Sequence, residues 1–199
     1  MCRLLETIKL NNGVLENISY HNLRINTARA ELFKTDTDIQ LEREVTIPCE
    51  FEKGLHRCRI VYKDIIEEIE YTPVPSRSFN KLKIIIHDRI DYHLKFEDRS
   101  LLNELFAQRG NADEIIIIKE GLVTDCTIGN LVFYDGTEWI TPDKPLLNGT
   151  RRQALLDREL ITEKRIIEKE LFDFQKAGII NTFFDLDHMP EIKIENIFY

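Results

Sequence analysis

The alternation of apolar and polar residues divides this chain into short strands and a few helices. Strand composition predicts a strand over Leu4 to Leu10, and the turn signal Asn11-Asn12-Gly13 predicts a hairpin that returns over Val14 to Ile18. Alternation predicts a strand over Leu55 to Tyr62, and continuous apolar runs predict strands over Glu114 to Ile118 and Ile179 to Leu186. Further strands are expected over Ile65 to Thr72, Leu82 to His87, Arg165 to Lys169 and Ile192 to Ile197.

Helical spacing of apolar residues marks four segments. The first begins after a cap at Ser19 or Asn22, ends near Lys34, and is expected to turn Leu23, Ala28, Leu32 and Phe33 inward. Further helices are expected over Ser100 to Arg109, Arg152 to Leu160 and Leu171 to Ala177. The stretch from Thr35 to Glu52 is charged and contains Pro48, so we expect only a short helix and a loop there.

Strands and helices are mixed along the chain without a strict alternation, which predicts an α+β fold. The segment Pro73-Val74-Pro75-Ser76-Arg77-Ser78 is the expected linker, because its prolines favour extended chain and remove hydrogen-bond donors. The sequence thus predicts a small N-terminal domain, residues 1–78, and a larger C-terminal domain, residues 79–199.

Composition narrows the possible functions. A net charge of −8 and a pI near 5.2 argue against a nucleic-acid partner, since phosphate backbones need a basic surface. The four cysteines have no C-x-x-C spacing, which favours reduced thiols over a disulfide framework or a zinc site. No apolar run approaches the ~20 residues of a membrane span, and no signal peptide is recognisable. We therefore expect a soluble cytoplasmic protein.

Two features between Glu120 and Leu156 could take part in ligand binding or catalysis. Asp125 ends an apolar run, and a carboxylate there could hold a protonated ring nitrogen. The run Asn148 to Arg152 places a glycine at a helix start, where free backbone N–H groups could hold a phosphate. Each has an ordinary alternative, because turn carboxylates are commonly solvated and Gly-Thr is a common helix cap. Lys95, taken alone, would be a surface lysine.

These residues belong to four segments that follow one another along the chain. The four segments are Leu5-Glu6-Thr7-Ile8 with the H-x-x-R of His21 to Arg24, Lys95-x-x-x-Arg99, Val123 to Leu131 with Ile140-Thr141-Pro142 beyond it, and Leu147 to Arg152. Together they resemble the class IV (fold type IV) pyridoxal-phosphate enzymes, which include D-amino acid and branched-chain aminotransferases and 4-amino-4-deoxychorismate lyase. The gap of 30 residues between Lys95 and Asp125 (125 − 95) also fits that family.

The resemblance implies a set of roles around pyridoxal 5′-phosphate. Lys95 would bind the cofactor aldehyde covalently and then move the α-proton of the substrate. Asp125 would pair with the pyridinium nitrogen. Arg24 would contact the phosphate, and Gly149, Thr150 and Arg151 would receive it. The resemblance also implies a mixed α/β pseudo-barrel for the larger domain, carrying the lysine and most of the cofactor site, and a homodimer.

The chain departs from the family pattern at identifiable points. Asp125 stands where the family usually has Glu, Val132 stands where an aromatic is usual, and Thr150 replaces a branched aliphatic residue. The N-terminal part is also shorter than in typical members. Regions that are shortened here often line the substrate pocket, so these departures bear on substrate choice and on activity itself.

The resemblance leaves the reaction open between two classes that share every cofactor residue. Ile179 to Phe184, with Asn181 as an expected cofactor contact, resembles the lyases more than the aminotransferases, as does Arg152-Gln153. We therefore favour release of pyruvate and 4-aminobenzoate from 4-amino-4-deoxychorismate, for folate synthesis. An aminotransferase for a small amino acid is the alternative, and a non-catalytic relative is the second. Asn181 could also simply cap a strand end.

Overall fold

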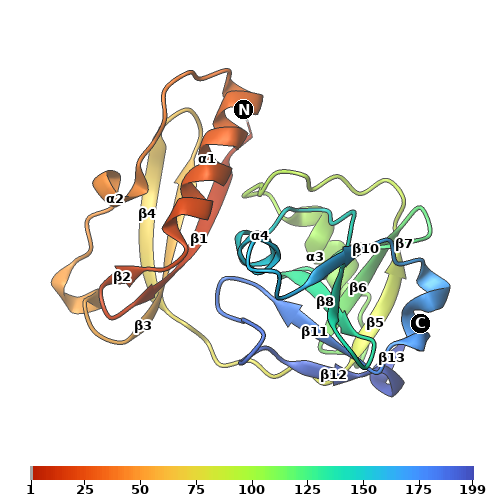
Figure 1. Cartoon of the computed structure of the whole chain (residues 1–199). Helices are drawn as coiled ribbons and strands as arrows, with labels where there is room; N and C mark the ends of the chain where they lie inside the picture. The colour runs from red at the N-terminus through yellow and green to blue at the C-terminus, as the bar shows by residue number, and fades with distance from the viewer. Residues whose placement is uncertain (1) are drawn as a thin grey trace. The chain divides into compact units, whose positions relative to one another are not determined.

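The computed structural model describes residues 2–199, and these form two compact units. The first unit contains the chain up to Ser76 together with Leu94–Asp98. The second contains Arg77–His93 and Arg99–Tyr199. Their elements can be followed by colour along the chain in Figure 1.

The first unit is built on an antiparallel sheet with strand order β2-β1-β3-β4. Its strands are β1 Leu4–Asn11, β2 Val14–Leu15, β3 Leu55–Tyr62 and β4 Ile66–Pro73. The expected hairpin is confirmed: Asn12 and Gly13 have φ of 48° and 78°, the left-handed pair that a tight hairpin turn requires. The expected return strand is shorter than predicted, since α1 already begins at Ile18.

Helix α1, Ile18–Phe33, packs Ile25 and Ala28 into the core of this sheet. The expected end near Lys34 is confirmed, with Lys34 in the left-handed conformation at φ 57°. The expected inner face is partly wrong, because Leu23 is 64% exposed and Leu32 is 38% exposed. His21 and Arg29 are buried instead, since each finds polar partners inside the unit, as Arg29 does on the carbonyls of Asp64 and Thr37.

The charged stretch after α1 contains the expected short helix and loop. Helix α2 spans Leu41–Glu44, and a 3-10 turn, η1, spans Cys49–Phe51 after Pro48. Side-chain amides of α1 hold this stretch: Asn22 Oδ1 accepts from Leu41 N at 2.9 Å, and Asn26 bonds both backbone groups of Ile39. The loop is therefore fastened to the helix rather than free.

The short segment Leu94–Asp98 belongs to the first unit, which corrects the assignment of the lysine to the larger domain. Leu5 N donates to the Lys95 carbonyl at 2.9 Å, and Glu97 N donates to the Arg3 carbonyl at 2.9 Å. Phe96 forms an isolated bridge with Leu4 and packs against the same core. Backbone pairing along β1, distant in sequence, thus decides where the lysine-bearing segment packs.

The second unit contains two sheets. One has the order β13-β5-β6-β7, from β5 Leu82–Ile86, β6 Glu114–Lys119, β7 Leu122–Val123 and β13 Ile197–Phe198. The other has the order β10-β9-β8-β11-β12, from β8 Asn130–Tyr134, β9 Trp139–Pro142, β10 Thr162–Lys164, β11 Lys176–Ile180 and β12 Glu191–Lys193. Ile84, Ile116 and Ile118 of the first sheet share one core with Leu131, Phe133 and Ile179 of the second.

Helices and turns connect these strands. They are α3 Ser100–Ala107, α4 Thr150–Leu156, η2 Glu168–Asp173 and η3 Ile194–Asn196. Strands β5 and β6 are parallel and α3 lies in the connection between them, whereas β8 pairs antiparallel with both β9 and β11. The mixed α+β class expected from the sequence is confirmed.

Two predicted elements near the end of the chain are wrong, and the strand expected over Ile179 to Leu186 ends at Ile180. The strand expected over Arg165 to Lys169 lies earlier, at Thr162–Lys164, and the helix expected over Leu171 to Ala177 is replaced by η2 and the start of β11. The register of β11 between β8 and β12 explains the second error. At Gly178 of this strand an added Cβ would lie 2.5 Å from the Met189 sulfur, which explains the glycine by close packing.

No helix within residues 2–199 is long and apolar enough to cross a membrane. The cysteines are free thiols: Cys2 and Cys49 are exposed, and Cys58 and Cys126 are buried.

Candidate functional site

Asp125 is a buried carboxylate whose partners are neutral. It lies between β7 and β8 with 4% of its surface exposed. Asn130 Nδ2 donates to Asp125 Oδ1 at 2.8 Å, and Leu147 N donates to Oδ2 at 2.9 Å. Burial raises the pKa of Asp125 to about 6, against the opposite effect of these two bonds and of the Arg152 charge. Within residues 2–199 no lysine or arginine forms an ion pair with it, so a cationic ligand would stabilise its charged form.

The backbone around Asp125 is fixed from several directions. Ile117 N of β6 donates to the Asp125 carbonyl at 2.9 Å, which extends the sheet edge to this residue. In the turn that follows, Arg99 Nη2 donates to the Thr127 carbonyl at 2.6 Å, and the Thr127 hydroxyl donates to the buried carboxylate of Glu114 at 2.8 Å. The Asp125 side chain therefore projects from a rigid support.

Sequence reasoning missed Glu114, the acceptor beneath this turn. It is 1% exposed, and burial raises its pKa. Its oxygen Oε1 also accepts from Ile115 N at 2.8 Å. The available signal was a glutamate at the start of the otherwise apolar strand over Glu114 to Ile118, because an acidic residue in such a position is usually buried only with partners.

The loop before α4 is fastened to Asp125 through Asn130. Asn130 Nδ2 donates a second bond to the Leu147 carbonyl at 2.8 Å. At Gly149 an added Cβ would lie 2.0 Å from Asn130 Oδ1, so this contact explains the glycine by close approach. Thr150 and Arg151, the first two residues of α4, are buried with 6% and 9% exposure.

Arg152 contacts the loop that precedes α4. It is 2% exposed and lies inside the unit rather than on a helix surface. Its Nη1 donates to Asn148 Oδ1 at 3.2 Å, and its Nη2 donates to the Pro142 carbonyl at 2.9 Å and to the Glu163 carboxylate. Arg152 thus holds both ends of the segment that connects β9 to α4.

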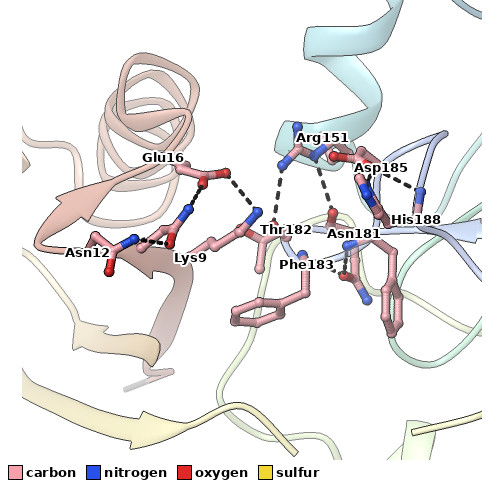
Figure 2. A network of polar contacts seen from close by, with 11 residues as sticks. Lys9, Asn12, Glu16, Arg151, Asn181, Thr182, Phe183, Asp185 and His188 are labelled. Atoms are coloured by element: carbon pink, nitrogen blue, oxygen red, sulfur yellow. Dashed lines mark hydrogen bonds and ion pairs between the residues drawn. The ribbon is translucent and has the colours of Figure 1, made fainter. Parts of the chain in front are cut away.

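Asn181 shapes the turn after β11. Its Oδ1 accepts from Phe183 N at 2.8 Å and from Phe184 N at 3.1 Å, and its Nδ2 donates to the Ile128 carbonyl at 3.2 Å. Figure 2 shows Arg151 directed toward the carbonyls of Asn181 and Thr182, each 3.4 Å from a guanidinium nitrogen. The side chain of Asn181 therefore has a structural role, and its contact with a cofactor stays a prediction.

In the first unit, Arg24 belongs to a buried polar cluster with Glu6 and His21. Arg24 Nε donates to Glu6 Oε1 at 2.7 Å and Nη2 donates to Oε2 at 2.5 Å, while His21 Nδ1 lies 2.7 Å from Oε2. Burial works to raise the pKa of Glu6, but the charge and bonds of Arg24 bring it down to about 2. Burial lowers the pKa of His21, and because a carboxylate oxygen only accepts, His21 Nδ1 donates to Glu6.

The sequence also contains a signal for the burial of Glu6. Leu4, Glu6 and Ile8 are spaced two residues apart along β1, so their side chains lie on the same face of the strand. Leu4 and Ile8 are fully buried, which places Glu6 on the inner face. Lys95 is half-buried, and its positive charge adds to the lowering of the His21 pKa. The ammonium group of Lys95 is therefore close enough to this cluster to act on it electrostatically.

The structure thus brings the expected residues together in two groups. In the second unit, Asp125 and Gly149 meet at Asn130, and Arg151 meets Asn181. In the first unit, Arg24 and Lys95 lie near His21. The assembly of both groups around one cofactor stays a prediction.

Comparison with known proteins places this chain in a family. Residues 95–186 match the family model described as amino-transferase class IV. An uncharacterized protein of Haemophilus influenzae is 42% identical over 183 residues, which cover 91% of this chain and 97% of that protein.

Solved structures extend the comparison. A candidate 4-amino-4-deoxychorismate lyase from Haemophilus somnus is 37% identical and superposes with a TM-score of 0.86, covering 92% of this chain and 96% of that chain. The PLP-bound form of a hypothetical aminotransferase from Mycobacterium tuberculosis, 17% identical, shares the fold with a TM-score of 0.77, covering 96% of this chain and 80% of that one. The chain is therefore a member of the class IV aminotransferase family of enzymes, with the fold of the fold type IV aminotransferases.

Proposed function

We propose that this protein is a pyridoxal-phosphate-dependent lyase that converts 4-amino-4-deoxychorismate to 4-aminobenzoate and pyruvate, a reaction of folate synthesis. The similar Haemophilus somnus protein is described as a candidate for this activity and matches this chain over nearly its full length. The substrate is accordingly a small amino-acid-like molecule.

The observation that carries the cofactor proposal is the environment of Asp125. Its buried carboxylate accepts two bonds from neutral N–H groups and has no ion-pair partner within residues 2–199. A carboxylate has about four acceptor positions, so a protonated ring nitrogen could be accommodated as a third donor. Such a partner would bring a positive charge to a group that burial otherwise disfavours in its charged form. The residue present therefore fits the pyridine ring of the cofactor.

The remaining roles follow from the chemistry of each side chain. Arg24 would contribute positive charge to the phosphate, held in place by the two bonds it makes to Glu6. Gly149, Thr150 and Arg151 would receive the same group on backbone and side-chain donors. The amine of Lys95 would hold the cofactor and move the proton at the substrate α-carbon. When bound, the cofactor would supply an electron sink for the charge that this proton leaves behind.

Absorbance spectroscopy with pyridoxal phosphate tests the cofactor proposal. Wild type should gain a visible absorbance band that borohydride removes, and Lys95→Ala should not. Lys95→Ala should fold normally, because Leu5 contacts the lysine through its backbone carbonyl. Lys34→Ala, on the exposed end of α1, is the matched control. A wild-type protein that stays colourless at saturating cofactor would favour the non-catalytic relative instead.

Product analysis then distinguishes the two reactions. The lyase should release 4-aminobenzoate and pyruvate from 4-amino-4-deoxychorismate without any added 2-oxo acid. The alternative is an aminotransferase of D-amino acid or branched-chain type, which the family model equally supports. It would require a 2-oxo acid and would leave the amino group on the cofactor between half-reactions. Turnover of a small amino acid with strict dependence on a 2-oxo acid would overturn the lyase proposal.

We further propose that the protein is cytoplasmic and acts as a homodimer, as the family resemblance implies. Sedimentation equilibrium at micromolar concentration tests the second point. The expected mass is twice the 23.5 kDa of one chain, and a mass of one chain would contradict it.

A further inference from the structure

We propose that Asn130 is a positioning residue that locks the Leu147–Gly149 loop onto the Asp125 carboxylate. This proposal deepens the function proposed above, since it concerns how the ring-binding carboxylate and the phosphate-binding loop are held together. It is carried by the bonds of one buried amide rather than by any bound ligand.

Two bonds from one nitrogen make the connection. Asn130 Nδ2 lies 2.8 Å from Asp125 Oδ1 and 2.8 Å from the Leu147 carbonyl oxygen. Both partners are acceptors, so the orientation of the amide group is fixed by its surroundings. The two N–H bonds of a single NH₂ group therefore join the carboxylate to the loop.

A third bond closes a ring of contacts. Leu147 N donates to the other oxygen of Asp125 at 2.9 Å, so both backbone groups of Leu147 are bound within one small network. Asn130 is 5% exposed and Asp125 is 4% exposed, so water competes weakly for these bonds. Removing the Asn130 amide would leave the Leu147 carbonyl and one carboxylate oxygen without their donor at the same time.

The far side of the amide packs against the next part of the loop. A Cβ added at residue 149 would lie only 2.0 Å from Asn130 Oδ1. The loop can therefore come this close only because residue 149 is glycine. Asn130 thus contacts the loop at both Leu147 and Gly149, through different atoms of one group.

The surrounding charges do not replace this connection. The charged group that acts on Asp125 from α4 is Arg152, whose hydrogen bonds go to Asn148, Pro142 and Glu163 rather than to Asp125. Beside Asp125, the buried thiol of Cys126 bonds the Gly129 carbonyl, and Glu114 acts on that thiol from β6. Among the described residues, Asn130 is the side chain that links Asp125 to the loop.

Amide hydrogen exchange of the cofactor-free protein tests the proposal directly. The Leu147 amide should exchange about tenfold faster or more in Asn130→Ala and in Asn130→Asp, because the network that holds it is broken. Asn103→Ala, an exposed asparagine of α3, is the matched control and should leave the exchange unchanged. Unchanged Leu147 exchange in a folded Asn130→Ala protein would overturn the proposal.

A paired substitution separates positioning from general destabilisation. In Asp125→Asn combined with Asn130→Asp, the new amide can donate to the new carboxylate and still accept from Leu147 N. Leu147 exchange should therefore be slower in the pair than in Asn130→Asp alone, where two carboxylates face each other. No recovery in the pair would contradict the network. If Asn130→Ala fails to fold, this comparison decides the matter.

A ligand measurement connects the network to the proposed function. Inorganic phosphate should bind several-fold more weakly to Asn130→Ala than to wild type, although Asn130 is not assigned to the phosphate. If Asn130→Ala bound phosphate as tightly as wild type while its Leu147 amide exchanged faster, the loop would have no part in phosphate binding. That result would overturn the connection to phosphate binding but not the positioning role of Asn130. Absence of phosphate or cofactor binding in wild type would count against the proposed function, whereas the exchange experiment would still decide the role of Asn130.

Discussion

The Arg24 guanidinium donates from two nitrogens to both oxygens of Glu6, and that carboxylate is fully buried. Burying a charge costs several kcal/mol, so a geometry with two parallel bonds is what makes the pair tolerable. The arrangement holds Arg24 through Nε and Nη2 and fixes the plane of the guanidinium. Glu6 therefore determines where the positive charge of Arg24 is presented.

Glu6→Gln should destabilise the protein by roughly 3 kcal/mol, because Arg24 would lose its charged partner while remaining largely buried. Chemical denaturation measures the free energy of unfolding. The matched control is Glu70→Gln, which breaks an exposed pair with Arg59 and should cost less than about 1 kcal/mol. If both variants lost the same free energy of unfolding, the buried pair would stabilise the protein no more than the exposed one.

The stabilisation from Glu6 should depend on pH. The folded-state pKa of about 2 lies below the ordinary value of 4.5, so the contribution is present above pH 4.5 and is lost as pH falls toward 2. The difference in unfolding free energy between wild type and Glu6→Gln should therefore shrink over this range. A difference that stays constant down to pH 2.5 would contradict the assigned role.

Asp125 should give the opposite trend. Its folded-state pKa of about 6 lies above the ordinary value of 3.8, so the folded protein binds the proton more tightly than the unfolded chain. Wild type should lose roughly 3 kcal/mol of stability as pH rises from about 4 to about 6, and Asp125→Asn should lack this component. Pyridoxal phosphate should reduce the loss if the ring nitrogen pairs with Asp125. Parallel pH curves for the two proteins would contradict the burial argument.

Gly149→Ala should destabilise the protein by about 1–3 kcal/mol and weaken binding of pyridoxal phosphate, because the new methyl group would overlap Asn130 Oδ1. The double variant Gly149→Ala/Asn130→Ala removes the atom that is overlapped. Its loss should therefore be smaller than the sum of the two single losses. Additive losses, measured by denaturation of all four proteins, would place the two residues out of contact.

Arg152→Lys should cost about 2–4 kcal/mol, because one ammonium cannot reach the Asn148, Pro142 and Glu163 acceptors at the same time. Arg158→Lys, at an exposed position just after α4, provides the control and should be nearly neutral. Thermal unfolding of the cofactor-free proteins is a sufficient measurement. A neutral Arg152→Lys would mean that the loop is held by other contacts.

The parts of the fold that could be predicted are those with local causes. Asn12 and Gly13 specify their turn through backbone preference, and the strand over Leu55 to Tyr62 follows from alternation alone. The inner face of α1 could not be predicted from local pattern, because Arg29 is buried and donates to the carbonyls of Asp64 and Thr37, which lie outside the helix. The same holds for β11, whose strand conformation depends on its neighbours β8 and β12.

The candidate site divides in the same manner. Asp125 and Gly149 could be predicted because their sequence context resembles a known family. The buried roles of Glu6 and Glu114 could not be predicted, because a carboxylate in a strand pattern shows its importance only when its partners are known. The place of Lys95 depended on backbone bonds to β1, some ninety residues earlier, which composition and periodicity do not encode.

The discontinuity of the first unit has a consequence for synthesis on the ribosome. Leu94–Asp98 completes the sheet edge at β1, so the unit cannot be finished when Ser76 emerges. The nascent N-terminal part must wait for residues 77–98, with the edge of β1 still unpaired, before its last hydrogen bonds can form. Cleavage in the Pro73–Ser78 segment of the mature protein would likewise leave the lysine-bearing piece on the other fragment, so a single nick would separate Lys95 from the chain that holds Arg24.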